Sequence, residues 1–227
     1  MWTLPGLRRS SLIALSLLTL PLLAQQPQRA VYLIGDAGQA GEDHSAPVLR
    51  LLQRVAAEDG TKERTLVFLG DNIYEQGLHK QGHPDREQDE KNIDAQIALA
   101  KAFQGKCFFI PGNHDWAQGA KSGWKTVQRQ QKYITEALGK KAFLPKGGCP
   151  GPEVVELGDH TVLVLIDTQW WLHKGERPRG ARDGCEVADE TEFLLALADI
   201  LKDYRDRHII LAGHHPLYTY GEHGGYF

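Results

Sequence analysis

The sequence has no excess of positive charge. It contains 26 Lys and Arg residues against 29 Asp and Glu residues, and its formal net charge is −3 at pH 7. Residues 1–24 include two arginines and no acidic residue, so a chain without them has a net charge of −5. No internal repeat or low-complexity segment is visible. Because binding to a phosphate backbone requires a surplus of Lys and Arg, we do not expect nucleic acid to be a partner.

Cysteine is scarce as well. The chain has 3 Cys residues and no C-x-x-C pair or neighbouring cluster of Cys and His, which argues against a structural zinc site. In an oxidising compartment an odd number of cysteines suggests one disulfide and one free thiol. Cys149 and Cys185 lie in glycine-rich polar segments, whereas Cys107 lies in a run typical of a buried strand. We predict a disulfide between Cys149 and Cys185, with three unpaired thiols as the alternative.

Long apolar runs are absent except for one near the start of the chain. Two arginines precede the run Leu12 to Ala24, which is too short for a comfortable membrane span and ends just before two glutamines. The pattern predicts a secretory signal in residues 1–24 and therefore an exported protein. Leu22 is a poor residue at the −3 position of the cleavage site, so an uncleaved anchor is the alternative. The rest of the chain suffices for one domain, which we predict over residues 28–227.

Apolar strands alternate with helices in the first part of the chain. Residues 30–34 form a continuous apolar run, as expected of a strand buried on both faces. A helix over residues 46–59 follows, with Val48, Leu51, Leu52 and Val55 at helical spacing. Further strands and helices are expected in alternation at residues 65–69, 87–103, 107–110 and 121–138. The alternation predicts an α/β fold with ligands at the carboxyl ends of the strands.

The second part of the chain has a different pattern. Residues 153–157 and 161–166 are strand-like runs joined by a short Gly-Asp-His connection, which predicts antiparallel pairing in a second sheet. A loop is expected over residues 167–189; its Trp170 and Trp171 could form a packing lid or stack on a nucleobase or aromatic leaving group. A helix at 190–204 and a strand at 208–212 complete the pattern.

Four short polar motifs each follow an apolar, strand-like run. They are Gly35-Asp36-Ala37-Gly38, Gly70-Asp71-Asn72-Ile73-Tyr74, Gly112-Asn113-His114-Asp115 and Gly213-His214-His215. Taken singly, a Gly-Asp pair is common turn chemistry and a tyrosine is more often a core residue. Their occurrence together, each at a strand end, favours a metal site instead, because Asp, Asn, His and Tyr supply the oxygen and nitrogen donors that metal ions require.

The donor types divide between two metal ions. A two-metal hydrolase needs a ligand shared by ions about 3.5–4 Å apart, and Asp71, directly after Gly70, suits that position. Asn113 and His214 offer a neutral amide oxygen and an imidazole nitrogen, which suit a divalent ion. Asp36 and Tyr74 are harder, anionic donors. A phenolate beside two carboxylates favours a trivalent ion such as Fe(III).

These motifs resemble the metallophosphoesterase superfamily and, within it, the purple acid phosphatases, including the small tartrate-resistant type. The purple branch carries the order GDxG, GDxxY, GNHD/E, VxxH and GHxH, and the first four are present, with Leu211 in place of Val. Many other branches begin with DxH; here Gly38 occupies the place of that histidine, and Tyr74 can substitute for it. The resemblance implies an αββα sandwich of two mixed sheets. It implies Asp36 and Tyr74 on Fe(III), Asp71 bridging, and Asn113 and His214 on Fe, Zn or Mn.

The resemblance also implies roles for two further histidines. His114 is expected beside the metals, contacting the phosphate or the leaving-group oxygen. His223 is a candidate substrate binder or general acid, with a solvated loop histidine as the alternative. Asp115 is expected to support its loop. The other histidines match no motif, and surface or helix-capping positions are expected for them; they are His44, His79, His83, His160, His173 and His208.

The expected function is that of an exported phosphatase with two metal ions, acting on small phosphomonoesters through a metal-bridging hydroxide. A phosphodiesterase or pyrophosphatase on the same metals is the first alternative. No GHxH follows His214, so we expect a longer precursor, with room for a further C-terminal domain, and a poor phosphatase in the 227-residue form. A metal-poor binding domain is the alternative if the native chain ends at Phe227.

Overall fold

The computed structural model describes residues 27–39 and 46–220. The predicted signal in residues 1–24, His44 and the candidate His223 lie outside the described residues. Within the described part, no helix is long and apolar enough to cross a membrane.

Two three-stranded sheets form the centre of the fold. The first is parallel, in the order β1-β2-β3, with the strands β1 (Arg29–Ile34), β2 (Glu63–Phe68) and β3 (Lys106–Phe109). The second has the order β4-β5-β6; β4 pairs antiparallel with β5, and β5 pairs parallel with β6. Its strands are β4 (Glu153–Glu156), β5 (Thr161–Leu165) and β6 (His208–Ala212). The predicted hairpin and both predicted sheets are therefore present.

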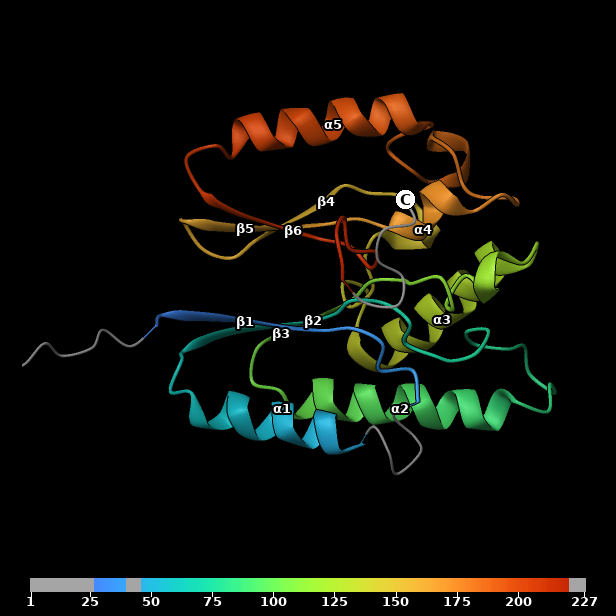
Figure 1. The fold of residues 1–227 in the computed structure, drawn as a ribbon, viewed down its shortest axis with the longest axis horizontal. Coiled ribbons are helices and arrows are strands. Elements are labelled where there is room, and N and C mark those ends of the chain that lie inside the picture. Colours follow the sequence, from blue (N-terminus) through green and yellow to red (C-terminus); the bar gives the residue numbers. More distant parts are fainter. Residues whose placement is uncertain (1–26, 40–45, 221–227) are drawn as a thin grey trace, which may run out of the picture.

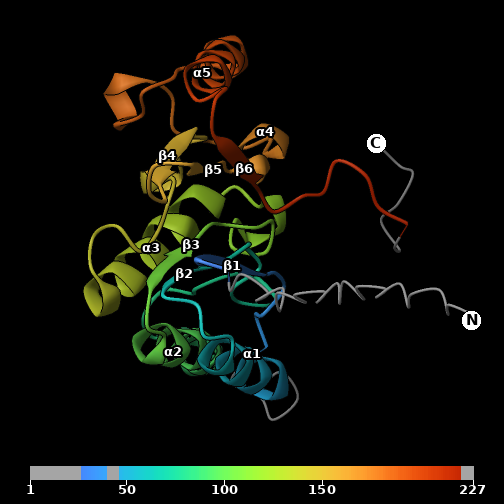
Figure 2. The ribbon, with the colours of Figure 1, turned by 90° about the vertical axis from the view of Figure 1, so that its left-hand side faces the viewer.

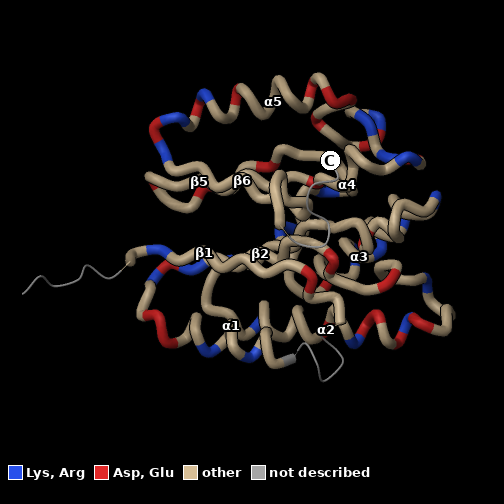
Figure 3. Tube along the Cα trace, viewed as in Figure 1, with Lys and Arg blue, Asp and Glu red and all other residues tan. Residues whose placement is uncertain are grey.

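Helices cover the outer face of each sheet. Figures 1 and 2 show four layers, with α1 and α2 below the first sheet, the second sheet above it, and α5 outermost. The helices are α1 (Ala46–Glu58), α2 (Arg86–Ala102), α3 (Gly123–Leu138), α4 (Thr168–Leu172) and α5 (Glu190–Asp203), with short 3-10 turns at Ala117–Gly119, Lys146–Gly148 and Ala181–Asp183. Figure 3 shows Lys and Arg interspersed with Asp and Glu along α2 and α5. The layering is that of the predicted αββα sandwich.

Strand β2 is buried on both faces, because successive side chains point alternately into one of two hydrophobic cores on opposite sides of the first sheet. Leu66 and Phe68 pack with the α1, α2 and α3 side of the fold, while Val67 packs in a second core between the sheets. Phe108 and Phe109 of β3 divide in the same way. This period of two follows from the alternation of side chains along a strand. The inter-sheet core holds the two sheets together.

Two expectations about burial were wrong. Strand β1 is an edge strand among the described residues, and its Leu33 side chain is 49 % exposed. On α1, the side chains of Val48, Leu51 and Val55 are 55 %, 48 % and 45 % exposed, while Leu49 is buried. The apolar stripe of this helix is wider than the surface it covers, so the sequence could not fix which part of the stripe meets the sheet.

The segment over residues 167–189 contains regular structure where a loop was expected. Residues Thr168–Leu172 form α4. Asp167 caps the N-terminus of this helix, and its carboxylate accepts a hydrogen bond of 3.1 Å from the Trp170 amide. The Trp170 ring is fully buried, its Nε1 donates to the Pro178 carbonyl at 2.8 Å, and the Arg177 guanidinium lies 3.9 Å from the ring centre. Trp170 is a core residue, so it is not available to stack on a substrate.

The predicted disulfide joins this segment to the loop before β4. Cys149 and Cys185 are bonded to each other, and Cys107 on β3 is a free thiol. Both bridged cysteines are buried. His173 is the C-terminal cap residue of α4, one of the two kinds of position expected for it, and it is buried, with its ring 4.8 Å from that of Trp116.

Candidate metal centre

The four polar motifs meet at one edge of the fold. β1, β2 and β3 are parallel, so the loops that carry Asp36, Asp71 and Asn113 leave the first sheet at the same edge. His214 follows β6, in the facing sheet. One ligand atom each from Asp36, Asp71 and His214 lie within 4.8 Å of one another. The structure therefore brings together five predicted ligands from both sheets, since Tyr74 and Asn113 contact this group.

Three lone-pair donors converge around His214. Its Nδ1 lies 2.9 Å from the Leu69 carbonyl, which can only accept, so Nδ1 carries a proton and Nε2 of the neutral ring carries a lone pair. Nε2 lies 2.9 Å from Asn113 Oδ1 and 3.5 Å from Asp71 Oδ1. All three atoms are acceptors, and a metal cation is the natural partner for such a group.

The other side of the centre is anionic. Tyr74 Oη donates to Asp36 Oδ1 at 2.9 Å. Burial, and next the charge of Asp71, raise the pKa of the Tyr74 phenol above its ordinary value, so the phenol holds its proton when only carboxylates surround it. A cation reverses this balance because it favours the phenolate. Tyr74 and Asp36 thus suit a strongly charged metal ion, which would take the place of the proton that Tyr74 donates to Asp36.

Close backbone contacts fix the loops that carry the ligands. A Cβ on Gly112 would lie 2.3 Å from Asp71 Oδ1 and 2.9 Å from His214 Cε1. A Cβ on Gly38 would lie 2.7 Å from the Tyr74 ring. The motif glycines therefore leave space that the ligands themselves fill.

Two of the proposed ligands have an unusual backbone conformation. Asp36 and Asp71 have positive φ angles of 60° and 52°. This region is costly for a residue with a side chain and is common at functional sites, where the surrounding structure enforces it. Both residues directly follow a Gly at a strand end, so the strain lies where the carboxylates turn toward the centre.

Asp115 supports the motif loops, as expected. It is fully buried, accepts a hydrogen bond from the Gly112 amide at 2.8 Å, and accepts two more from Asn72, through the backbone amide and Nδ2. Burial, followed by the charge of Asp71, raises the pKa of the Asp115 carboxyl. Asp115 ties the second motif to the third and does not face His214.

His114 lies against the centre. Its backbone amide donates to Asp71 Oδ1 at 2.9 Å, and its ring packs edge-on to Tyr74 with 4.4 Å between ring centres. Nδ1 donates to the Glu75 carbonyl at 2.6 Å, which leaves the lone pair on Nε2, 3.8 Å from Asp71 Oδ2. The ring of His215 packs edge-on to that of His214 with 4.8 Å between ring centres, and its Nδ1 is 2.7 Å from the hydroxyl of Thr168 on α4.

Gln96 is a functional residue that the sequence did not reveal. It lies on α2, is fully buried, and its Nε2 donates to the carbonyl of Asn72 at 2.7 Å and to that of Ala37 at 3.1 Å. It thereby joins the first two motif loops from below. The available signal was a polar residue on the buried face of a helix, between Ile93 and Ile97.

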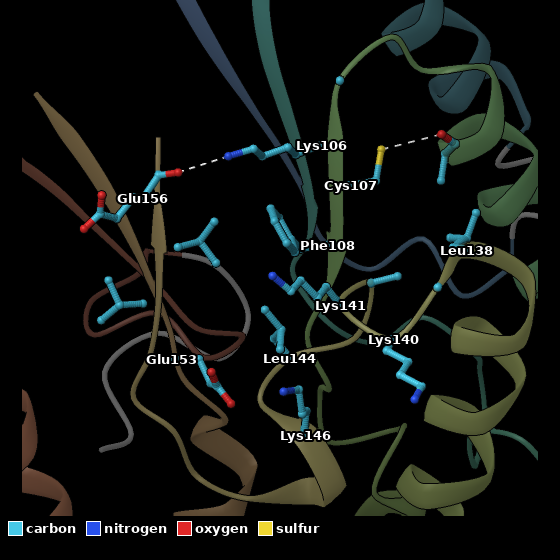
Figure 4. Close-up of a pocket in the computed structure, with 16 residues that line it drawn as sticks. Lys106, Cys107, Phe108, Leu138, Lys140, Lys141, Leu144, Lys146, Glu153 and Glu156 are labelled. Carbon is cyan, nitrogen blue, oxygen red and sulfur yellow. Dashed lines mark hydrogen bonds between the residues drawn. The ribbon is translucent and has the colours of Figure 1, made fainter. Parts of the chain in front are cut away.

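A cavity of about 740 Å³ lies elsewhere, between the edge strands β3 and β4 (Figure 4). Figure 4 shows lysine side chains, including Lys140 and Lys146, together with Glu153 around it. None of the predicted site residues that the structure describes lines this cavity. The metal centre is therefore identified by the donor atoms that it brings together, and it does not coincide with this cavity.

The fold and the donor set define the class of protein. The family described as calcineurin-like phosphoesterase matches residues 30–227, and the chain belongs to this family. Among curated proteins, purple acid phosphatase 17 of Arabidopsis thaliana is 24 % identical over 198 residues, which cover 85 % of the chain and 53 % of the relative. The chain thus spans about half the length of this relative.

Family membership implies a centre of two metal ions, and the residues present fit it. The three acceptors around His214 match a divalent ion, and the pair Asp36 and Tyr74 matches a harder one. Asp71 lies between the two groups: Oδ1 faces His214, and its charge acts on the Tyr74 phenol. A ligand shared by two ions requires such a position.

Proposed function

We propose that this protein is a metal-dependent phosphoester hydrolase and that it acts as an acid phosphatase on small phosphomonoesters. The convergence of the His214, Asn113 and Asp71 acceptors carries the proposal, because a lone-pair cluster of this kind is unfavourable without a cation. Family membership supports phosphoester hydrolysis, and the resemblance to a purple acid phosphatase supports the phosphatase branch.

Each proposed ligand has a separate task. Asp36 and Tyr74 would hold Fe(III), Asn113 and His214 would hold a divalent Fe, Zn or Mn ion, and Asp71 would contact both. When bound, two such ions activate water and neutralise the charge that develops on phosphorus. The Leu69 carbonyl keeps the His214 ring in the tautomer that leaves Nε2 free, as hydrogen-bonding partners of metal ligands commonly do.

His114 would hold the proton for the leaving group. Its Nδ1 is engaged by the Glu75 carbonyl, so Nε2 is the atom free to meet substrate beside Asp71. When Nε2 carries a proton, it can donate to the oxygen that departs. His114→Ala should keep its metal and lose about 100-fold or more in kcat; loss of one metal equivalent would show that His114 is a ligand instead.

Export is part of the proposal. The disulfide between Cys149 and Cys185 supports it, because such bonds persist in oxidising compartments. A small phosphorylated molecule is the proposed substrate. The buried Trp170 ring cannot stack on a nucleobase or an aromatic leaving group.

The test is phosphate release from an aryl phosphate by the full-length protein supplied with iron and zinc. Asp71→Asn should lower kcat by about 1,000-fold or more and release most of the metal, since both ions share this charge. Asp159→Asn, an exposed carboxylate in the β4–β5 turn, is the matched control. Turnover that survives Asp71→Asn would overturn the proposed centre.

The purple branch has its own readout. The iron-loaded protein should show a visible absorption band from the Tyr74 phenolate, and Tyr74→Phe should abolish it. A band of equal intensity in Tyr74→Phe would refute Tyr74 as an iron ligand while leaving the hydrolase proposal standing.

A further inference from the structure

The second sheet supplies only His214 to the metal centre, and the main chain at this residue has few supports of its own. The last main-chain hydrogen bond between the ends of β5 and β6 runs from the Ile166 amide to the Ala212 carbonyl at 3.0 Å. Among the described residues, the main chain of Gly213, His214 and His215 forms no hydrogen bond with another main-chain group. The position of His214 therefore depends on side chains.

Thr168 on α4 provides such a side chain. Its Oγ1 accepts a hydrogen bond of 3.1 Å from the His215 amide and lies 2.7 Å from Nδ1 of the same residue. One hydroxyl can serve both groups, because its oxygen accepts while its hydrogen is donated. The Thr168 methyl group is also close, since a Cβ on Gly213 would lie 2.7 Å from Cγ2. Thr168 thus packs against both chain neighbours of His214.

The anchor for this contact is itself fixed. Thr168 is the first residue of α4 and follows Asp167, which is fully buried. The Asp167 amide donates to the Pro150 carbonyl at 3.0 Å, and its carboxylate accepts from Trp116 Nε1 at 2.9 Å. A ligand is held precisely only when the groups that support it are held by their own packing and hydrogen bonds.

The contacts of the His214 ring do not replace this support. Nδ1 donates to the Leu69 carbonyl at 2.9 Å, and a ring held at one atom can pivot about it. Nε2 faces Asn113 Oδ1 at 2.9 Å, and both atoms are acceptors, so they repel each other until a cation lies between them. Without metal, this repulsion pushes the ring away from the centre. A contact on the main chain beside His214 opposes that movement.

We propose that Thr168 is a positioning residue for His214, a role that rests on the proposed metal centre. The Thr168 hydroxyl holds the main chain at His215, and this main chain keeps His214 Nε2 at the position of a metal ligand. Thr168 acts through His215 and is not a ligand itself. It lies outside the four polar motifs, so α4 contributes to the centre without supplying a donor atom.

The experiment measures the Zn²⁺ affinity of the full-length, iron-loaded protein. Thr168→Val keeps the branched shape and removes both hydrogen bonds, so the affinity should fall by about 10-fold or more, as it does for other outer partners of metal ligands. Thr168→Ser keeps the hydroxyl and should bind Zn²⁺ nearly as tightly as the wild type. Thr135→Val is the matched control, because the Thr135 hydroxyl bonds only to carbonyls of its own helix, α3, and the affinity should not change.

A second readout needs no metal. In ¹⁵N-histidine spectra of the metal-free wild type, the His214 ring should show a single tautomer with its proton on Nδ1. Thr168→Val should give averaged His214 ring signals, because the ring is then free to leave the Leu69 carbonyl. Thr168→Ser and Thr135→Val should keep the wild-type signals. Circular dichroism checks that each variant is folded.

The outcomes separate this role from the proposed function. Equal Zn²⁺ affinities for Thr168→Val and a wild type that binds two ions would overturn the positioning role and leave the proposed function standing. An equal fall in both valine variants would also overturn it, because a general loss of stability would then explain the change. If the wild type bound no metal, the proposed centre would fail, and the His214 signals alone would decide whether Thr168 holds this ring. Unchanged His214 signals in Thr168→Val would overturn the role in either case.

Discussion

The two sheets contribute unequally to the metal centre. The first sheet delivers four of the five proposed ligands from the ends of three adjacent parallel strands, whereas the second sheet delivers only His214. The positions of Asp36, Asp71 and Asn113 relative to one another follow from the strand pairing within one sheet. The position of His214 depends on how the two sheets pack, through a core that includes Val67, Leu163 and other apolar residues.

The two halves of the site therefore have different structural supports. Hydrogen-bonded pairing fixes strand neighbours directionally, while packing between sheets is set by side-chain volume. Polar contacts also cross between the halves. In one of them, Trp116 Nε1 in the first half donates to Asp167 Oδ2 at the end of β5 at 2.9 Å. Three predictions test the two supports separately.

The largest effect is expected from removing the single ligand of the second sheet. His214→Ala should lower the affinity for one of the two ions by more than the roughly 100-fold that loss of an outer hydrogen-bonding partner costs. The second ion should stay bound, because Asp36, Asp71 and Tyr74 remain. Metal analysis after dialysis measures this. Loss of both ions together would show that the two halves do not bind independently.

A smaller effect is expected from adding a side-chain atom to one of the loops at the carboxyl ends of the first sheet's strands. Gly112→Ala places a Cβ 2.3 Å from Asp71 Oδ1, so Asp71 must move and metal affinity should fall by roughly 10–100-fold. Gly35→Ala is the matched control, because its Cβ meets only Leu69 Cβ, at an ordinary 3.7 Å. Zn²⁺ titration of both variants gives the comparison. Equal affinities would mean that the close backbone approach does not position Asp71.

The last effect is expected on folding stability, not on metal binding, at the contact between Trp116 and Asp167. Burial raises the pKa of the Asp167 carboxyl from 3.8 to about 8 in the folded protein. The folded state therefore binds this proton more tightly than the unfolded state. The stabilisation is fully present below pH 4 and is lost as the pH rises toward 8, by at most about 1.4 kcal/mol per pH unit.

Asp167→Asn removes this titration and keeps an oxygen that can accept from Trp116. Relative to the wild type, the variant should gain stability as the pH rises from 5 to 8. Urea unfolding at both pH values measures the difference. If the free energies of unfolding of the two proteins changed equally between pH 5 and pH 8, Asp167 would not be protonated in the folded state. Its contact with Trp116 would then not depend on pH.

Local pattern was sufficient where the structure depends on neighbours along the chain. The strand over residues 208–212 and the β4–β5 turn were predicted, because apolar period and turn residues report them directly. The disulfide joins residues 36 positions apart and was predicted from the polar surroundings of Cys149 and Cys185 and the strand-like surroundings of Cys107. Helix α4 was missed, since it has only five residues, and its N-terminal cap is the buried Asp167. The exposed side of α1 was also missed, because a wide apolar stripe does not say which part is covered.

The set of donor atoms and the strand ends that carry them can be read from the amino-acid sequence, since each motif directly follows its own apolar run. That His214 Nε2 faces Asn113 Oδ1, and that Gln96 holds two motif loops from beneath, is visible only in the folded protein. The two kinds of information differ in range along the chain. Strand and turn preferences act over a few neighbouring residues, whereas His214 and Leu69, 145 residues apart, meet only when two sheets pack together.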